Sequence, residues 1–457
     1  MKKCIISLIA LCFGIISYSQ EKVFSYEEYI EIVKKHHPIS YQAGLQIERG
    51  EAYVMKAKGG FDPKLGAAID QKYFKGSQYY SHINSKLVVP TWFGLSAQAG
   101  YESNEGIYLN PEFQTPTTGL INAGLSLTLG KGLFIDERRA ELKQAKIYQN
   151  STEQEQRIIR NKLIYNASVV YWKWKVSFLK MKVYEEALVN AQVRFEGVKQ
   201  SVKLGDKPAI DTTEAKITIQ NRLIKYEQAK LDFENTRLKL GVYLWQDGFI
   251  PLELDSATTP KSELNVELNP TNFNDSIIDN HPELMLYQNK IEIQKIENRL
   301  QKEGLKPTLN LNYNFLNEQV GENPLPDLNV NNYKWGATFS YPIFIRKERA
   351  QVKLSQIMLN ETISNTELKR ATLNYKIRSS RNNINALSTQ LEISNAAVDN
   401  YKKLFNSENS LFNIGESNVF MINTREKSYI NSQLKNLDIY FKLLKFNQEY
   451  SYNLMEF

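Results

Sequence analysis

One segment of the chain lacks helix breakers over a length that ordinary globular domains do not use. Between Leu133 and Lys203 there is no proline, and the single glycine is Gly197. A helix of about 70 residues would be roughly 105 Å long, whereas helices in globular proteins average about three turns. The segment therefore predicts a very long α-helix that packs along other helices instead of crossing a compact core.

Apolar residues recur along this segment at alternating spacings of four and three, which is the seam of a coiled coil. The series is Leu163, Ala167, Val170, Trp174, Ser177, Met181, Tyr184, Leu188, Ala191, Phe195, Val198 and Val202. A second series is Leu387, Leu391, Ser394, Val398, Tyr401, Phe405 and Phe412. The pattern predicts helices that lie side by side, and by itself it does not indicate transport.

Other segments alternate with a period of two, as β-strands with two unlike faces do. In 308–315 the apolar set is Leu309, Leu311, Tyr313 and Phe315, separated by asparagines. The segments 333–341 and 121–129 alternate in the same way, and 65–74, 79–89 and 93–102 do so more weakly. Runs of about 9–11 residues suit tilted strands of a membrane barrel. A soluble sheet with one wet face would also alternate, but the aromatic-rich face favours the barrel.

The chain contains an internal repeat. Residues 37–65 match 281–309, and a second block matches at another offset, with Phe134-Ile135 on Phe344-Ile345. The first copy carries about 34 extra residues at about 76–110, which predict two more strands around Pro90. These strands either add to the barrel wall or form an extracellular extension.

The first twenty residues are typical of a signal peptide, with Lys2 and Lys3 before a short apolar run and small residues at 17–19. Both cysteines of the chain, Cys4 and Cys12, lie in this leader. Lipidation at Cys12 is disfavoured because Leu11 stands where a small residue is wanted. The mature chain is therefore expected to have no disulfide, no thiol nucleophile and no cysteine metal site.

The charge and the motifs argue against nucleic-acid binding and against catalysis. The formal net charge is +7, but basic and acidic residues are mixed along the chain, which indicates a solvated surface. His37 and His281 precede prolines, and His36 and His82 lack ligands at metal spacing. The sequence has no phosphate loop, nucleophile elbow or zinc-hydrolase motif. We therefore expect no enzyme activity, no cofactor and no metal.

These patterns divide the chain into two repeats joined by a linker. We expect a signal peptide at 1–20, a first repeat at 21–245, an equatorial linker at 246–270 and a second repeat at 271–457. The elements of the first repeat are a helix 26–58, a β segment 64–130, a long helix 133–203 and a return helix 209–245. Those of the second are a helix 273–302, a β segment 307–342, a long helix 344–412 and a return helix 419–453.

Nearly the whole mature chain resembles the TolC-type family of outer-membrane efflux and secretion proteins. The matching pieces occur in family order: His37-Pro38 and His281-Pro282, 307–311 entering a strand, 339–344 leaving one, 378–380 with 382–386, and the turns at Leu204-Gly205 and Ile414-Gly415. The fold class implied is an α+β membrane protein: a trimeric outer-membrane β-barrel continued by a long periplasmic α-helical barrel, with an internal two-fold repeat. The family has four strands per chain, so the extra segment departs from its pattern.

The resemblance also implies a function. It predicts the passive outer-membrane channel of a tripartite efflux or type I secretion system in a Gram-negative bacterium. The implied partners are two further copies of the chain, a periplasmic adaptor protein, an inner-membrane RND or ABC transporter, and outer-membrane lipid. The alternative is a structural coiled-coil protein of the cell envelope without a pore, which would have no use for strands with apolar aromatic faces.

By the same resemblance, the turns between long helices form the periplasmic tip where the adaptor docks. The candidate docking residues are Val202, Leu204, Gly205, Phe412, Ile414 and Gly415. Counting from the glycines places Asp211 at a position that is acidic in the family, with Met421 and Thr424 at the matching positions of the second copy. We expect Met421 to form part of a pore constriction with Asp211 beside it, and no acidic ring. Asp211 could equally serve its helix, since it lies in the first turn after Pro208.

Overall fold

The computed structural model describes residues 23–264, 266, 268, 275–318 and 330–457. The expected signal peptide at 1–20 and the first two residues of the helix expected at 273–302 lie outside the described residues. The chain divides into two compact units. The helical unit comprises the chain up to Gly44, 157–281 and 372–457, and the sheet unit comprises 45–156 and 282–371.

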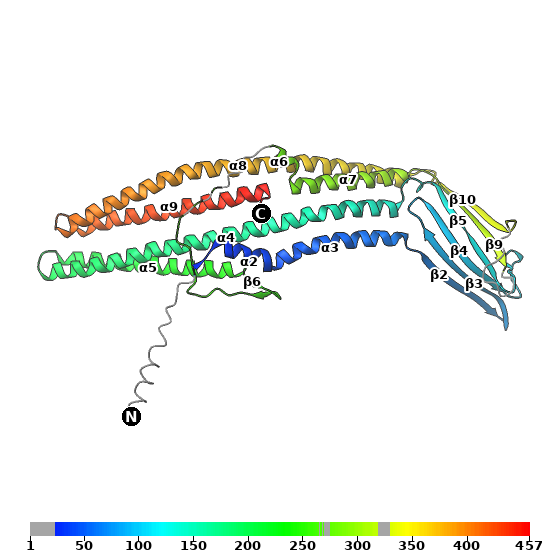
Figure 1. Ribbon diagram of the computed structural model, residues 1–457, viewed down its shortest axis with the longest axis horizontal. Coiled ribbons are helices and arrows are strands. Elements are labelled where there is room, and N and C mark those ends of the chain that lie inside the picture. Colours follow the sequence, from blue (N-terminus) through cyan, green and yellow to red (C-terminus); the bar gives the residue numbers. More distant parts are fainter. Residues whose placement is uncertain (1–22, 265, 267, 269–274, 319–329) are drawn as a thin grey trace, which may run out of the picture. The chain divides into compact units, whose positions relative to one another are not determined.

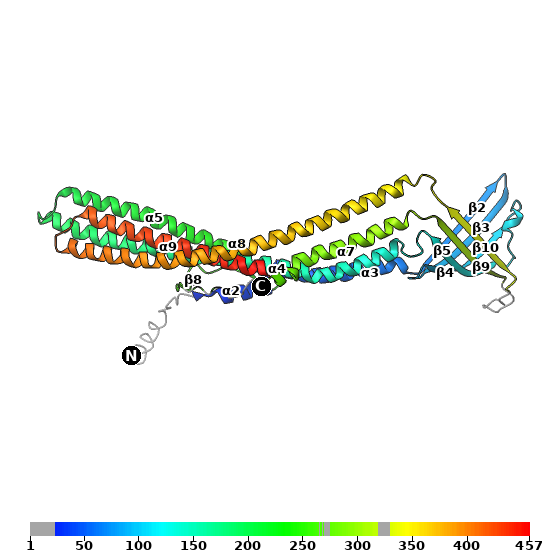
Figure 2. The same cartoon turned by 90° about the horizontal axis from the view of Figure 1, so that it is seen from above.

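Four helices make up most of the helical unit. They are α4 (Glu137–Lys203), α5 (Ala209–Gly241), α8 (Arg346–Asn413) and α9 (Val419–Leu454), of which α4 and α8 extend beyond the unit. Within the unit, α5 returns along α4 and α9 returns along α8 (Figures 1 and 2). The long helices have 67 and 68 residues, because neither contains proline and the apolar seam gives each a partner along its length.

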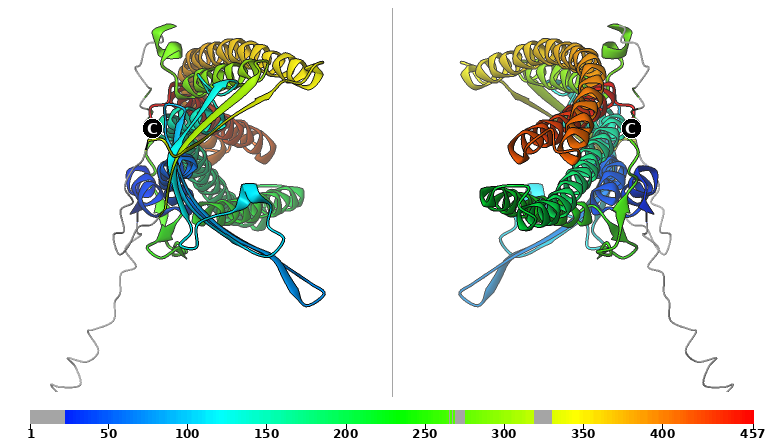
Figure 3. Two further views of the ribbon diagram at one scale, coloured as in Figure 1. Left: turned by 90° about the vertical axis from the view of Figure 1, so that its right-hand side faces the viewer. Right: turned by 90° about the vertical axis from the view of Figure 1, so that its left-hand side faces the viewer.

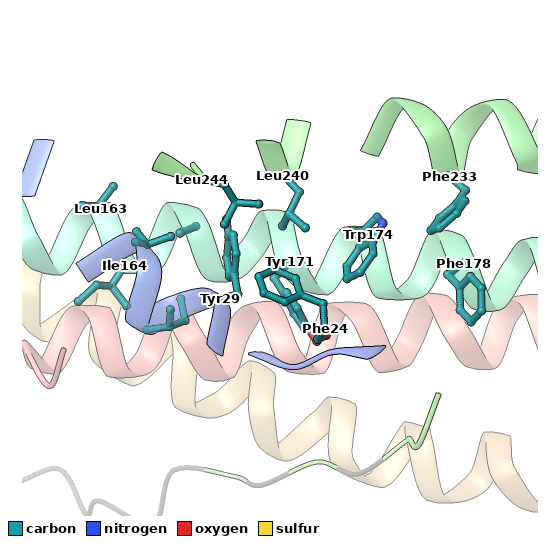
Figure 4. Close-up of a cluster of buried hydrophobic side chains, with 13 residues drawn as sticks. Phe24, Tyr29, Leu163, Ile164, Tyr171, Trp174, Phe178, Phe233, Leu240 and Leu244 are labelled. Carbon is teal, nitrogen blue, oxygen red and sulfur yellow. The ribbon is translucent and has the colours of Figure 1, made fainter. Parts of the chain in front are cut away.

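A core rich in aromatic side chains joins the N-terminal segment, α4 and α5 within this unit (Figure 4). Trp174 and Tyr171 of α4 are fully buried, Phe233 of α5 stacks on Trp174, and Tyr29 stacks on Tyr171. The Tyr171 hydroxyl donates to the carbonyl oxygen of Phe24 at 2.8 Å. The core therefore fastens the N-terminal segment to the seam of the two helices.

The helix expected at 26–58 is two helices, α2 (Tyr26–His36) and α3 (Pro38–Lys58). The break lies at His37, whose backbone is extended, because a residue before proline is driven away from the helical region. Burial lowers the pKa of His37, and its Nδ1 accepts the Ile39 N–H at 3.1 Å. The expected helix 273–302 is likewise α6 (Asp275–Asp279) and α7 (Pro282–Glu303), interrupted at Asn280 and His281. Both single-helix predictions are therefore corrected.

Short strands tie the expected linker to the helical unit. β6 (Trp245–Gln246) pairs antiparallel with β7 (Ile250–Pro251), and β8 (Thr259–Pro260) pairs in parallel with β1 (Val23–Phe24). Nδ1 of His36 lies 2.8 Å from a carboxylate oxygen of Asp247. Residues 265, 267, 269 and 270 of the linker lie outside the described residues.

The described residues of the sheet unit form one antiparallel sheet of six strands, in the order β10-β9-β5-β4-β3-β2. The strands are β2 (Lys64–Phe74), β3 (Ser77–Pro90), β4 (Leu95–Glu105), β5 (Leu120–Gly130), β9 (Thr308–Glu318) and β10 (Tyr333–Ser340). The sheet is curved and twisted (Figure 3). The extra segment of the first copy supplies β3 and β4, which lie between β2 and β5 and widen the sheet.

The strand register gives the sheet two different faces. Leu65 lies opposite Leu87, Leu127 opposite Leu311, and Phe339 opposite Leu309, so the apolar sets of all strands share one face. The other face is polar: Nε2 of Gln98 donates to Oδ1 of Asn314 at 2.6 Å. On the apolar face large side chains stay exposed, with Leu65 at 79%.

Helices α3 and α7 and the adjoining parts of α4 and α8 complete the sheet unit. Val54 and Ala57 of α3 pack on Ala145 of α4, and Nδ2 of Asn298 in α7 donates to Ser355 of α8 at 2.9 Å. Across the described ranges, no helix has a stretch both long and apolar enough to cross a membrane.

Candidate functional site at the helical hairpins

The two turns that join the long helices to their return helices have the same backbone geometry. The N–H of Gly205 donates to the carbonyl of Val202 and that of Asp206 to Ser201, at 3.1 and 2.9 Å. In the second hairpin Gly415 donates to Phe412 and Glu416 to Leu411, at 3.2 and 2.9 Å. This is the Schellman C-cap. Both glycines have φ near +85° (85° and 84°), the region that glycine enters without steric cost.

The six candidate docking residues separate into two groups. Leu204 and Ile414, each just before its glycine, are 77% and 69% exposed. Val202 and Phe412 are half-buried and pack on a small core of Val198, Ala215 and Val419. Leu204 and Ile414 therefore present apolar surface at the two turns, together with the exposed glycines, whereas Val202 and Phe412 join the hairpins to each other.

A cation–π contact crosses between the two hairpins. Nζ of Lys207, in the turn after α4, lies 3.6 Å from the centre of the Phe412 ring of α8. Burial lowers the pKa of Lys207, and the nearby Asp211 carboxylate acts in the opposite direction. Lys207 therefore links the turn between α4 and α5 to the end of α8 in the second hairpin.

The three candidate constriction residues lie on the return helices. Asp211 is in the first turn of α5, where a negative charge is favourable. Met421 and Thr424 lie one turn apart on α9. Met421 is 36% exposed and Thr424 is exposed, and the Thr424 hydroxyl donates to the carbonyl of Phe420 at 2.8 Å. The two helices meet through Ala215 and Val419, so these residues share one region of the hairpins.

A buried ion network is centred on Glu426, roughly three helical turns after Gly415 along the chain. Glu426 of α9 has a side-chain exposure of 2% and accepts two hydrogen bonds from Arg194 of α4, at 3.0 and 3.1 Å. Arg222 of α5 donates to the same carboxylate at 3.4 Å. The network therefore joins three helices of the helical unit through one carboxylate.

Neutral polar groups continue this network. Arg194 also donates to Oδ1 of Asn423 at 2.9 Å, and Asn423 donates to the Thr218 hydroxyl at 3.1 Å. The motifs in the sequence did not indicate any of these residues. Their signal in the sequence is weak, because a charged residue on a long helix is usually solvated.

The described residues contain no group of three or more His, Cys, Asp or Glu placed to hold a metal ion. The hairpins offer exposed apolar turns, a cation–π bridge and a buried ion network. Such an arrangement can bind a protein and can hold helices in one packing.

Comparison with known proteins gives a family-model match over part of the chain. Residues 275–425 match the model of the outer membrane efflux protein family, over α7, both strands of the second copy and the second hairpin. No curated protein sequence matches the chain.

The fold is that of solved outer-membrane channels. The CmeC outer membrane channel of Campylobacter jejuni superposes with a TM-score of 0.68 at 14% identity, over 96% of this chain and 90% of that one. The MtrE outer membrane channel of Neisseria gonorrhoeae gives 0.68 at 12%, over 94% and 88%. The outer membrane protein VceC of Vibrio cholerae gives 0.66 at 12%, over 94% and 95%.

The chain thus shares its fold with outer-membrane channels, and its described residues are mostly helical with one large sheet. The match of residues 275–425 to the outer membrane efflux protein model and the shared fold confirm the resemblance to TolC-type proteins that the sequence indicates.

Proposed function

We propose that the chain is the outer-membrane exit duct of a tripartite efflux or type I secretion system. Three copies would close their sheets into a barrel and their helices into a tunnel, and an inner-membrane RND or ABC transporter would supply the energy through a periplasmic adaptor. The observation that carries this proposal is the sheet register, which gathers the apolar residues of six strands on one face and leaves many of the large ones exposed. A face of this kind suits lipid, and the polar face behind it suits a water-filled passage.

The element order supports the duplicated architecture. In each half a helix leads to strands, a long helix, a glycine turn and a return helix. The alternative of a coiled-coil envelope protein without a pore accounts for the helices but not for the sheet. Under the duct proposal, the adaptor binds directly to the exposed turn residues Leu204, Gly205, Ile414 and Gly415. Val202 and Phe412 do not contact the adaptor but pack in the core that joins the two hairpins.

We assign the narrowest part of the duct to the return helices near the tip. Met421 and Thr424 present side chains on one face of α9, and Asp211 stands in the first turn of α5. A ring of three Met421 side chains would narrow the passage without a strong charge. Asp211 would add carboxylates beside it.

The docking proposal predicts loss of export when the exposed apolar residues of the turns are made acidic. Burying a leucine or isoleucine stabilises a contact by about 1.5–3 kcal/mol, so Leu204→Asp with Ile414→Asp should weaken adaptor binding about 100-fold or more. Export is measured in a strain that lacks the native chain, as retention of a dye, a metal ion and a secreted polypeptide. The double variant should leave that strain's export defect in place.

Asp206→Asn with Glu416→Gln is the matched control, because it changes the same two turns and keeps their apolar surface. It should restore export as the unmodified chain does. Full export with the acidic double variant would refute docking at these turns. A strain that exports all three probes normally without the chain would refute the duct.

A further inference from the structure

The six-stranded sheet ends in two edge strands that have no outer partner within the described chain. β2 and β10 stand at the ends of the strand order, and every residue of both is exposed. An edge strand presents a row of unpaired N–H and C=O groups, which invites another strand. In lipid such groups must be paired.

The two edges can pair with each other when they come from different copies. Because the six strands alternate in direction, β2 and β10 run in opposite directions. β2 has Leu65 and Ile69 on the apolar face, 79% and 67% exposed, and β10 has Trp335 and Phe339 there, 66% and 67% exposed. An antiparallel junction of β2 with β10 would continue the apolar face from one copy to the next.

The side chains select one register for this junction. A slip by one residue would turn apolar residues to the polar face, so only slips by two need comparison. Lys334, on the polar face of β10, can then lie opposite Ala68, Asp70 or Lys72 of β2. Opposite Lys72 it meets a like charge, which destabilises a strand pair. Opposite Ala68, the β10 residue Phe339 falls beyond the first residue of β2.

The register with Lys334 opposite Asp70 has neither defect. It places Trp335 opposite Ile69 and Phe339 opposite Leu65, and it aligns Ser340 with Lys64, the residues at which the two strands meet the helix connections. Opposite charges and large apolar pairs across strands both stabilise a sheet. All eight residues of β10 find an opposite residue in β2.

We propose that β10 of one copy pairs with β2 of a second copy in this register, with an ion pair between Lys334 and Asp70 across the junction. The proposal rests on the trimer of the proposed function. Three chains of six strands each then close a barrel of eighteen strands, instead of the twelve that four strands per chain would give. Since barrel diameter grows roughly linearly with strand number, the pore in the sheet region is about half as wide again.

Intersubunit disulfides test the register directly. Residues directly opposite in antiparallel strands have Cα atoms about 4.5–5.5 Å apart, within the range that a disulfide spans, whereas a slip by two residues moves them beyond it. The native cysteines, Cys4 and Cys12, lie in the expected signal peptide. The full chain carrying Asp70→Cys and Lys334→Cys is extracted in detergent, oxidised and run on a gel without reductant.

We expect a covalent trimer from this variant, and severalfold less from Ala68→Cys or Lys72→Cys combined with Lys334→Cys. Native mass measurement of the reduced proteins controls for assembly. A trimer that links preferentially through position 68 or 72, or that links through none of the three, overturns the register. A chain that forms no trimer even without substitutions overturns the proposed function as well, so the two failures are distinguishable.

A charge exchange tests the ion pair. Asp70→Lys should lower the temperature at which the extracted trimer dissociates, because two lysines then face each other. Adding Lys334→Asp should restore that temperature. The ion pair is refuted if the double exchange dissociates at the temperature of Asp70→Lys alone.

Discussion

Replacing Glu426 with glutamine should lower the free energy of unfolding of the helical unit by about 3–5 kcal/mol, the cost of removing one partner from a buried ion pair. The substitution keeps the shape of the side chain and removes its charge. Arg194 and Arg222, with 7% and 13% of their side chains exposed, would then stay buried without a counter-charge. The measurement is a urea titration followed by far-UV circular dichroism.

Glu196→Gln is the control for Glu426→Gln. Glu196 pairs with Lys199 on the surface of α4, at 61% and 42% exposure, so its loss should cost less than about 1 kcal/mol. Replacing all three network residues by leucine or methionine should destabilise less than Glu426→Gln alone, because no charge is then left unpaired. An unchanged urea midpoint for Glu426→Gln would contradict the buried network.

Trp174→Ala should destabilise the helical unit by about 3–5 kcal/mol, the cost of deleting a large buried aromatic side chain. Trp174 is 0% exposed and lies between Tyr171 and Phe233, with ring centroids 5.7 and 6.1 Å away. Alanine would leave a cavity in the core that joins α4 to α5 and to the N-terminal segment. The same urea titration measures the effect.

Trp174→Phe separates packing from hydrogen bonding. The buried Nε1 of Trp174 has no hydrogen-bond partner among the described residues, so phenylalanine keeps most of the ring and removes a donor that is costly to bury. We expect a loss of about 1 kcal/mol or less. A loss equal to that of Trp174→Ala would contradict the expectation that a smaller aromatic ring can replace the indole in this core.

The long elements could be predicted from the sequence because their signals are local and repeated. The helix expected at 133–203 corresponds to α4, Glu137–Lys203. A long segment that lacks proline and carries a continuous apolar seam has few alternatives to a helix. The turns at Gly205 and Gly415 follow from glycine at the end of such a run. The strands could also be predicted, from their period-two alternation. Their order in the sheet could not, and only the strand pairing in the structure shows that β3 and β4 lie between β2 and β5.

The sequence did not predict two features of the helices. The helix breaks at His37 and His281 were missed because the apolar pattern continues through them, although Pro38 and Pro282 mark the positions. The network around Glu426 was missed because its partners lie on α4 and α5, far away in sequence. Whether a given charge is buried depends on which helix faces meet, and helical periodicity alone does not pair one charge with another.

Electron microscopy of the detergent-extracted full chain can show whether three copies form a hollow duct. The duct predicts hollow particles with three-fold symmetry in end views, and a channel that continues from the sheet region into the helices in side views. A monomer, a solid rod or a barrel without a helical tunnel would contradict it.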